Sequence, residues 1–334
     1  MIIRYLFISL CLLICSSCIS NKNSYAELNG ITQGTTYHIV YLDQAYNNYS
    51  IDVENILMSI DTLFSTYLPI SLVSRINNNI TYSTTNVEFI NLVNLSNEIN
   101  KKTNGAFDIT VGPLVRLWGF GPDSVPVADT SKIKDLLKNI GMQYLQVSDS
   151  QLIKLNGSTI LDFNAIAQGY AVDKISLFLE SKKVKNYLVE IGGEVRTKGV
   201  NRNGISWRIG IDKPIEGNMH AGENLQAILS ISGKSIATSG NYRKYYKKEG
   251  NTYAHTINPK SGFPAENDML SATIIADDCA RADGYATACM VLGFENSKKI
   301  LKSNNLEGFF VYTKNGKPDV YKSEGFTYLV KDDK

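Results

Sequence analysis

The clearest helical pattern in the chain spans residues 51–64. Apolar residues recur there on one face of a helix, at Val53, Ile56, Leu57, Ile60 and Phe64. We expect this helix to end near Ser65, because Pro69 follows shortly and the residue before a proline is biased away from helical geometry. Four further helices are predicted, at residues 86–99 behind an Asn86 cap, 131–139, 168–179 and 279–292.

Short alternating runs between these helices predict β-strands. Two strands joined at a glycine turn are expected in residues 26–42, one near 144–147, and a final hairpin near 309–321. Five more are expected to form an antiparallel meander, at residues 187–191, 207–211, 227–231, 235–238 and 253–257. The pattern therefore predicts an α+β fold with mixed, largely antiparallel sheets and packed helices.

The composition is that of a folded globular protein and excludes a disordered chain. The 334 residues are 43% hydrophobic and 20% charged. They can bury the core of a single large domain, which we expect at residues 28–334. The net charge is only +2 and no dense run of Lys or Arg occurs, so we expect no nucleic-acid partner.

The N-terminal residues predict export. Residues 1–17 carry one positive charge, at Arg4, before an apolar stretch too short to span a bilayer comfortably. They end in Cys15-Ser16-Ser17-Cys18, which resembles a bacterial lipoprotein box with Cys18 as the lipidated residue. Residues 18–27 would then be a tether, and the protein a membrane-anchored lipoprotein on the periplasmic side. The alternative is an ordinary cleaved signal peptide.

Only Cys279 and Cys289 remain for the folded body. If both lie on one helix, their spacing puts the two Cα atoms roughly 15 Å apart, which is too far for a disulfide. We therefore predict no structural disulfide.

Residues 159–173 are the first candidate for a functional turn. A short apolar run ends there on Asp162 and passes through small residues into a predicted helix. Backbone N–H groups and a carboxylate at the start of a helix suit a phosphate and a metal ion. The alternative is a packing turn in which Asp162 only caps the helix.

Three more side chains could carry chemistry. Asp283 and Thr287 are four residues apart, so both could reach a hard cation from one helix face. In the alternative, Thr287 bonds back to its own helix. His255 precedes a turn rich in Pro and Gly, and it could serve as an acid, a base, a ligand or a structural residue.

Residues 104–122 contain too many Gly, Pro and aromatic residues for a plain helix or strand. Such a segment can line the binding site of a flat ligand, with the ring of Phe107 or Trp118 against the ligand face and Asp108 as a polar contact. The alternative is a loop that belongs to the core. The sequence lacks the common nucleotide-binding and zinc-binding motifs.

Several segments in this order resemble the motifs of the ApbE family, the FAD:protein FMN transferases. The resemblance spans about residues 28–330 and is carried by Gly34-Thr35-Thr36-Tyr37, Ser65-Thr66-Tyr67, Gly192-Gly193 and residues 105–115, 118–122, 162–173, 237–243, 255–264 and 282–293. It implies an ApbE-like, T-fold-like architecture. It also implies a magnesium-dependent enzyme that splits the pyrophosphate of FAD, joins FMN to a Thr or Ser of an acceptor flavoprotein through a phosphoester bond, and releases AMP.

The resemblance also implies roles for individual residues. Magnesium would be held by Asp283, Thr287 and the backbone carbonyl of Ala165, with His255 as the candidate for proton transfer. The substrate FAD would lie against Gln33, Tyr67, Ala106, Phe107, Asp108, Asp162, Gln168 and Ile257.

Four positions differ from residues that are common in the family. Gln33 replaces a Met, Asn164 a Gly, Gln168 a Lys or Glu, and Thr287 the second Asp of some members.

Two other functions stay open: an FAD pyrophosphatase that uses water as acceptor, and a lipoprotein that binds FAD without turnover. Acceptors of the family carry a motif Asp-x-x-Ser/Thr-Gly-Ala-Thr, which this sequence lacks. The acceptor is therefore expected to be another protein, such as a membrane redox subunit.

Overall fold

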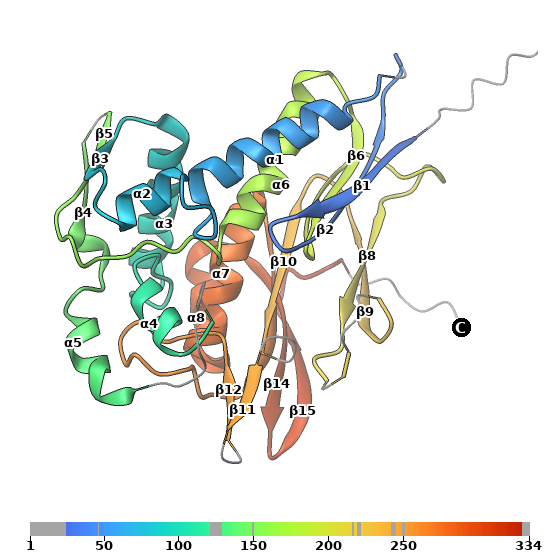
Figure 1. Cartoon of the computed structure of the whole chain (residues 1–334). Helices are drawn as coiled ribbons and strands as arrows, with labels where there is room; N and C mark the ends of the chain where they lie inside the picture. Colours follow the sequence, from blue (N-terminus) through green and yellow to red (C-terminus); the bar gives the residue numbers. More distant parts are fainter. Residues whose placement is uncertain are drawn as a thin grey trace, which may run out of the picture.

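The computed structural model describes residues 25–45, 47–120, 129–148, 150–215, 217–218, 222–241, 245–248 and 251–328. Within these residues the largest element is an eight-stranded antiparallel sheet (Figure 1). Its strands, in spatial order, are β1 (Ala26–Thr32), β2 (Thr35–Leu42), β6 (Asn186–Ile191), β7 (Glu194–Lys198), β10 (Ser235–Gly240), β13 (Met269–Ala276), β14 (Glu307–Lys314) and β15 (Lys317–Lys322).

The central strands of this sheet are buried on both faces. In β2, Ile39 points into the main core beneath the helices, and the next residue, Val40, points into a second core on the other side. Strand β14 repeats this alternation with Phe310 and Phe309. The second core is closed by the hairpin of β8 (Trp207–Asp212) and β9 (Leu225–Ile231), which lies against that face (Figure 1).

Helices α1 (Ser50–Phe64), α6 (Ala167–Ser181), α7 (Cys279–Leu292) and α8 (Phe294–Asn304) cover the other face of the sheet (Figure 1). The predicted helix at residues 51–64 is confirmed, and it ends at Ser65 as expected. The predictions for α6 and α7 are also confirmed to within two residues. Cys279 and Cys289 are both buried and free in α7.

A smaller helical lobe lies beside this core. It contains α2 (Leu72–Asn77), α3 (Val87–Lys102), α4 (Gly112–Leu117), α5 (Ile133–Leu137) and a three-stranded sheet of β3 (Ser83–Thr84), β5 (Gln151–Lys154) and β4 (Leu145–Ser148). Asn86 caps α3 as predicted, since its side chain accepts from the N–H of Phe89. The helix predicted at residues 131–139 is shorter than expected, because only α5 and one preceding tight turn form.

The prediction of a meander after residue 187 is wrong. Strand β10 pairs with β7 and β13, whereas β8 and β9 form a separate two-stranded sheet among the described strands. Alternating apolar residues indicate which face of a strand is buried but not which strand is its neighbour, so a sequential order was only the simplest assumption. Strands β11 (Tyr245–Lys248) and β12 (Asn251–Ala254) form a separate hairpin.

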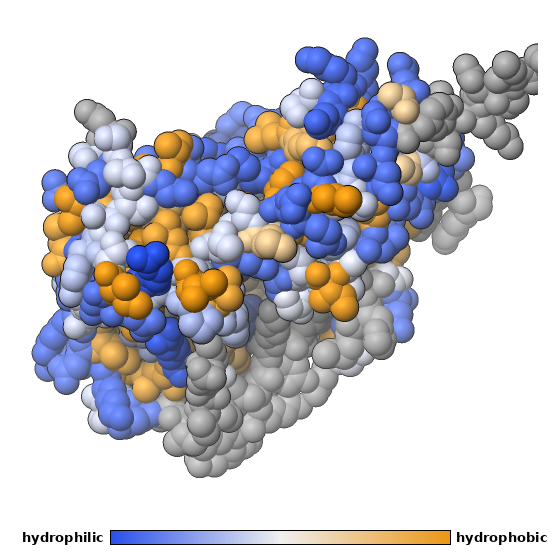
Figure 2. Space-filling model, turned by 45° about the horizontal axis from the view of Figure 1, so that its top comes forward, coloured by the Kyte–Doolittle hydropathy of each residue, from blue (hydrophilic) through white to orange (hydrophobic). Residues whose placement is uncertain are grey.

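The surface above α1 and the β1–β2 hairpin is largely hydrophilic, with hydrophobic side chains in separate spots (Figure 2). Scattered exposed apolar residues of this kind are normal for a folded domain. In the described ranges, no helix combines the length and apolar character needed to cross a membrane. The predicted signal peptide and Cys18 lie outside those ranges, and the single-domain assignment at residues 28–334 stays a prediction.

Candidate active site

The first turns of α6 and α7 touch each other at the centre of the candidate site. A Cβ atom on Gly169 would lie 2.5 Å from the carbonyl oxygen of Cys279 and 2.8 Å from the Cα atom of Ala280. Only a glycine at this position lets the two backbones approach so closely. This contact brings together two segments that are more than one hundred residues apart in the sequence.

The contact supplies a hydrogen-bond acceptor at the start of α6. Gly169 is the third residue of α6, so its N–H is one of those that a helix start leaves without an intrahelical acceptor. It donates to the Oδ2 atom of Asp283, at 3.2 Å. Among the hydrogen bonds of the described residues, none reaches the Ala165 carbonyl. An acceptor oxygen without a donor therefore lies in the same turn as the Asp283 contact.

Asp283 is a buried acid, with 6% of its surface exposed. Burial raises the pKa of this carboxyl, the Gly169 hydrogen bond lowers it and the nearby Asp173 raises it, with a net rise to about 7. Within the described residues, the Gly169 N–H is its single hydrogen-bond donor. A buried carboxylate with so few donors is stabilised by a cation.

Thr287 lies one helical turn beyond Asp283. Its Oγ1 atom is 3.4 Å from the hydroxyl of Ser239 on β10, and no bond back to its own helix is seen in this part of the structure. No cluster of three His, Cys, Asp or Glu side chains among the described residues could hold a metal ion. A cation site here would thus use carbonyl and hydroxyl oxygens beside one carboxylate, a donor set that suits Mg²⁺.

Asp162 has a different role from the one expected of a helix cap. Its Oδ1 atom accepts from the N–H of Asn164 at 2.8 Å, while the cap position of α6 is Ile166. The capping alternative is therefore wrong, and Asp283 supplies the carboxylate at the helix start. The apolar run before Asp162 is no regular strand either, since it makes a single bridge, between Ile160 and Val111.

Tyr67 and Arg116 share the surroundings of Asp162. Burial raises the pKa of Asp162, and the charge of Arg116 opposes that rise. Burial also raises the pKa of Tyr67, and the Asp162 carboxylate adds to the effect. Because Tyr67 is nevertheless 63% exposed, its ring can meet a ligand.

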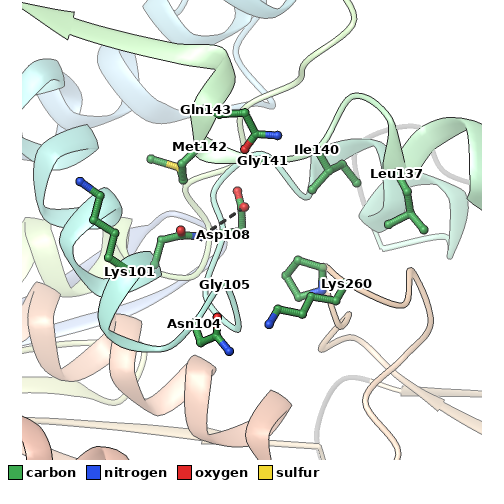
Figure 3. Close-up of a pocket in the computed structure, with 12 residues that line it drawn as sticks. Lys101, Asn104, Gly105, Asp108, Leu137, Ile140, Gly141, Met142, Gln143 and Lys260 are labelled. Carbon is green, nitrogen blue, oxygen red and sulfur yellow. Dashed lines mark hydrogen bonds between the residues drawn. The ribbon is translucent and has the colours of Figure 1, made fainter.

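A pocket of about 520 Å³ opens beside Asp108 (Figure 3). Asp108 accepts from the N–H of Thr110 at 2.8 Å and from the amide of Asn100 at 3.2 Å, and burial raises its pKa. Lys101 and Lys260 also line the pocket, from α3 and from the segment after β12. Its volume lies in the range of small-molecule sites.

The rings of Phe107 and Trp118 wall no ligand site, because they are only 2% and 3% exposed. Phe107 packs against α7, where a Cβ on Gly284 would lie 3.6 Å from its ring. Trp118 packs in a small core with Ile257 and donates to the carbonyl of Gly262 at 2.7 Å. The two aromatic rings thus belong to the core, while Gly105 and Asp108 of the same segment line the pocket. Within the segment α4 is a short helix that we did not predict. Ala106 is buried as well.

Gln33 and Gln168 lie at the other end of the site. Gln33 occupies the β1–β2 turn with a φ of 50°, and its Oε1 atom is buried without a partner in the described residues. The Gln168 amide would be 3.2 Å from a Cβ on Gly192, which itself lies beside Thr35. The two hairpin turns therefore meet the start of α6.

His255 contacts the ring of Phe120, with 6.3 Å between centroids. No individual role was predicted for Gly169, Ser239, Arg116 or Lys260, although three of them lie in segments that carry the family resemblance. Small residues around Gly169 were the signal that could have indicated a close contact between α6 and another helix, because close helix packing requires such residues.

Comparisons with known proteins agree with the fold. A model of the ApbE family matches residues 33–310. The chain is 36% identical over 288 residues to the FAD:protein FMN transferase of Vibrio cholerae, which covers 84% of this chain and 85% of that protein.

Two solved structures are similar over most of the chain. The flavin transferase ApbE from Vibrio cholerae has a TM-score of 0.81 and 32% identity, covering 91% of this chain and 98% of that one. The apo form of the Pseudomonas stutzeri flavinyl transferase ApbE has a TM-score of 0.80 and 33% identity, covering 90% and 95%.

Proposed function

The chain belongs to the ApbE family and is a flavin transferase, and from this premise we propose that it transfers FMN from FAD to an acceptor flavoprotein. The product would be a phosphoester between FMN and a Thr or Ser side chain, with AMP released. The observation that carries this proposal is the junction of α6 and α7. There the donor-poor Asp283 meets a helix turn whose Ala165 carbonyl is unused by the described residues.

The reaction exchanges one phosphorus–oxygen bond for another. The acceptor hydroxyl oxygen bonds to the phosphorus of the FMN half, and the bond from that phosphorus to the bridging oxygen breaks. AMP leaves with the bridging oxygen and its electron pair. The hydroxyl proton needs a base, and His255 is our candidate at the side of the site formed by residues 104–120.

Asp283, Thr287 and the Ala165 carbonyl would hold a magnesium ion. Their oxygens fit a hard cation, and few protein ligands are needed when phosphate oxygens and water complete the shell. A bound ion would neutralise the charge that develops on the pyrophosphate as the bond to AMP lengthens. The first N–H groups of α6 would add a favourable field for the phosphates.

FAD would extend from this junction in two directions. The buried, unpartnered Oε1 atom of Gln33 and the amide of Gln168 lie toward the hairpin turns. The exposed ring of Tyr67 beside Asp162 offers a face for the flavin, and the pocket at Asp108 has room for one end of the dinucleotide. Ala106, Phe107 and Ile257 are buried, so they would contribute through the backbone.

One assay tests the proposal against its two alternatives. The purified protein is incubated with FAD and Mg²⁺, with and without an acceptor domain that carries the Asp-x-x-Ser/Thr-Gly-Ala-Thr motif. We expect AMP release together with covalent flavin on the acceptor, and no covalent flavin when the acceptor Thr or Ser is replaced by Ala. Free FMN and AMP without acceptor would instead indicate a pyrophosphatase. Retained, intact FAD would indicate a binding protein.

We also propose that the protein is a periplasmic lipoprotein anchored through Cys18, with a membrane redox subunit as its acceptor. The support is the export signal and the lipoprotein box of the sequence. In this case Cys18→Ala should release the protein into the soluble fraction of the cell and remove the lipid mass from its N-terminus. An unchanged membrane fraction would contradict the anchor.

A further inference from the structure

A second buried acid, Asp173 on α6, faces the N-terminus of α7. Its two oxygens accept from the N–H groups of Cys279 and Ala280, both at 2.9 Å. The guanidinium of Arg196 on β7 donates to the same carboxylate at 2.6 Å. Asp173 therefore meets three donors from two elements, and its charge is balanced by an arginine.

The arrangement at the junction is reciprocal. Asp173 of α6 binds the first two N–H groups of α7, while Asp283 of α7 binds the N–H of Gly169 in the first turn of α6. The third N–H of α7, that of Arg281, donates to its own cap residue, Asp278, at 3.0 Å. The N–H groups of the first three residues of α7, which a helix start leaves unpaired, thus all have acceptors.

These bonds fix where α7 presents its side chains. Cys279, Asp283 and Thr287 follow at intervals of four residues, so they lie along one side of the helix. Because Asp173 binds the first two backbone N–H groups, it sets both the axial position and the rotation of α7. The backbone contact at Gly169 leaves no space in which α7 could settle closer to α6.

We propose that Asp173 is a positioning residue for the transfer reaction. It fixes the axial position and the rotation of α7, so that Asp283 and Thr287 are directed at the metal. This inference rests on the proposed function. Among the hydrogen bonds of the described residues, none joins Asp173 to Asp283, Thr287 or Ala165. Asp173 acts on them through the backbone of α7. Supporting residues of this kind change metal affinity when they are replaced.

The test compares Asp173→Asn with Glu180→Gln. Asn keeps the size of the side chain but cannot accept from two N–H groups and an arginine together. Glu180 is the matched control, because it lies on the same helix and approaches Arg196 at 3.7 Å without contacting α7 through a hydrogen bond. Two midpoints are measured. The first is the Mg²⁺ concentration that gives half-maximal AMP release. The second is the Mn²⁺ concentration that gives half-maximal binding, followed by the loss of the free-ion electron paramagnetic resonance signal.

We expect Asp173→Asn to raise both midpoints about tenfold to a hundredfold, and Glu180→Gln to leave them within about twofold. At saturating Mg²⁺ the rate of Asp173→Asn should largely recover. A purely structural role would lower the amount of active protein without moving either midpoint, and that result would overturn the inference.

Gly169→Ala gives an independent test of whether the position of α7 sets the metal affinity. This variant replaces Asp173→Asn as the test if Asp173→Asn does not fold. Its Cβ would push against the Cys279 carbonyl and displace α7, together with Asp283 and Thr287, without removing either carboxylate from the protein. The same rise in both midpoints is expected, and unchanged midpoints would overturn the inference. If the wild type neither binds Mn²⁺ nor needs Mg²⁺, the proposed metal site fails instead, which separates the two outcomes.

Discussion

Asp173 and Asp283 are buried acids at the same helix junction, and they differ in what surrounds them. Asp173 accepts from two backbone N–H groups and from Arg196. Asp283 accepts from one N–H among the described residues and has no cationic partner there. The first carboxylate is satisfied by the protein alone and serves the fold. The second is left with unused acceptor capacity, as expected for a ligand of a cation.

The strongest test of this difference is the loss of activity in Asp283→Ala. Removing the one carboxylate of the proposed metal site should lower Mg²⁺-dependent AMP release from FAD by about a thousandfold or more, because a metal ion contributes several kcal/mol to such reactions. The rate is measured at saturating FAD, with circular dichroism to show that the variant is folded. A rate equal to that of the wild type would remove Asp283 from the metal site.

For stability we expect the opposite order, with the larger loss in the Asp173 variant and the smaller loss in the Asp283 variant. Asp173→Ala should lower the free energy of unfolding by about 3–5 kcal/mol, because it leaves Arg196 and two buried N–H groups without their partner. In the absence of Mg²⁺, Asp283→Ala should lower it by less, about 1 kcal/mol, since it leaves only the N–H of Gly169 unpaired and also removes a buried carboxylate that no cation balances. Urea unfolding of both variants in the same metal-free buffer provides the measurement. Equal losses would show that the two acids do not divide the roles of fold and site.

Thr287 sharpens the comparison within the site. Thr287→Val removes the hydroxyl while keeping the shape of the side chain, so the Mg²⁺ midpoint for AMP release should rise about tenfold. Thr287→Ser retains the hydroxyl and is expected to stay close to the wild type. If Val and Ser give the same midpoint, the hydroxyl is not a ligand.

The smallest effect concerns a third acid that holds the same turn of α7. Glu98 pairs with Arg281 at 2.7 and 3.1 Å, and this pairing, with Lys102, lowers the pKa of Glu98 from 4.5 to about 2. Its contribution to stability is therefore present above pH 4.5 and is lost as the pH falls toward 2. Because the pair is partly exposed, Glu98→Gln should cost only about 1 kcal/mol or less at pH 6, and less still at pH 3. A difference between the two proteins that is the same at both pH values would contradict this assignment.

Much of the fold could be predicted from the sequence. The spacing of apolar residues located α1, α3, α6 and α7, and the alternation of apolar residues located strands such as β2 and β14. These patterns report which side of an element is buried, and burial is decided locally by the period of the backbone. The order of β7, β10 and β13 escaped prediction, because pairing depends on contacts between segments that are far apart in the sequence.

The sequence alone also placed the oxygen-bearing side chains of Asp283 and Thr287 on one helix face, because their spacing of four residues is a property of the helix. Only the tertiary structure decided which buried acid meets which helix start. It assigned Asp283, not Asp162, to the first turn of α6, and it paired Asp173 with α7 and Arg196. The reason is physical: the donors that satisfy a buried carboxylate come from backbone more than one hundred residues away, and they reach it only after the helices have packed.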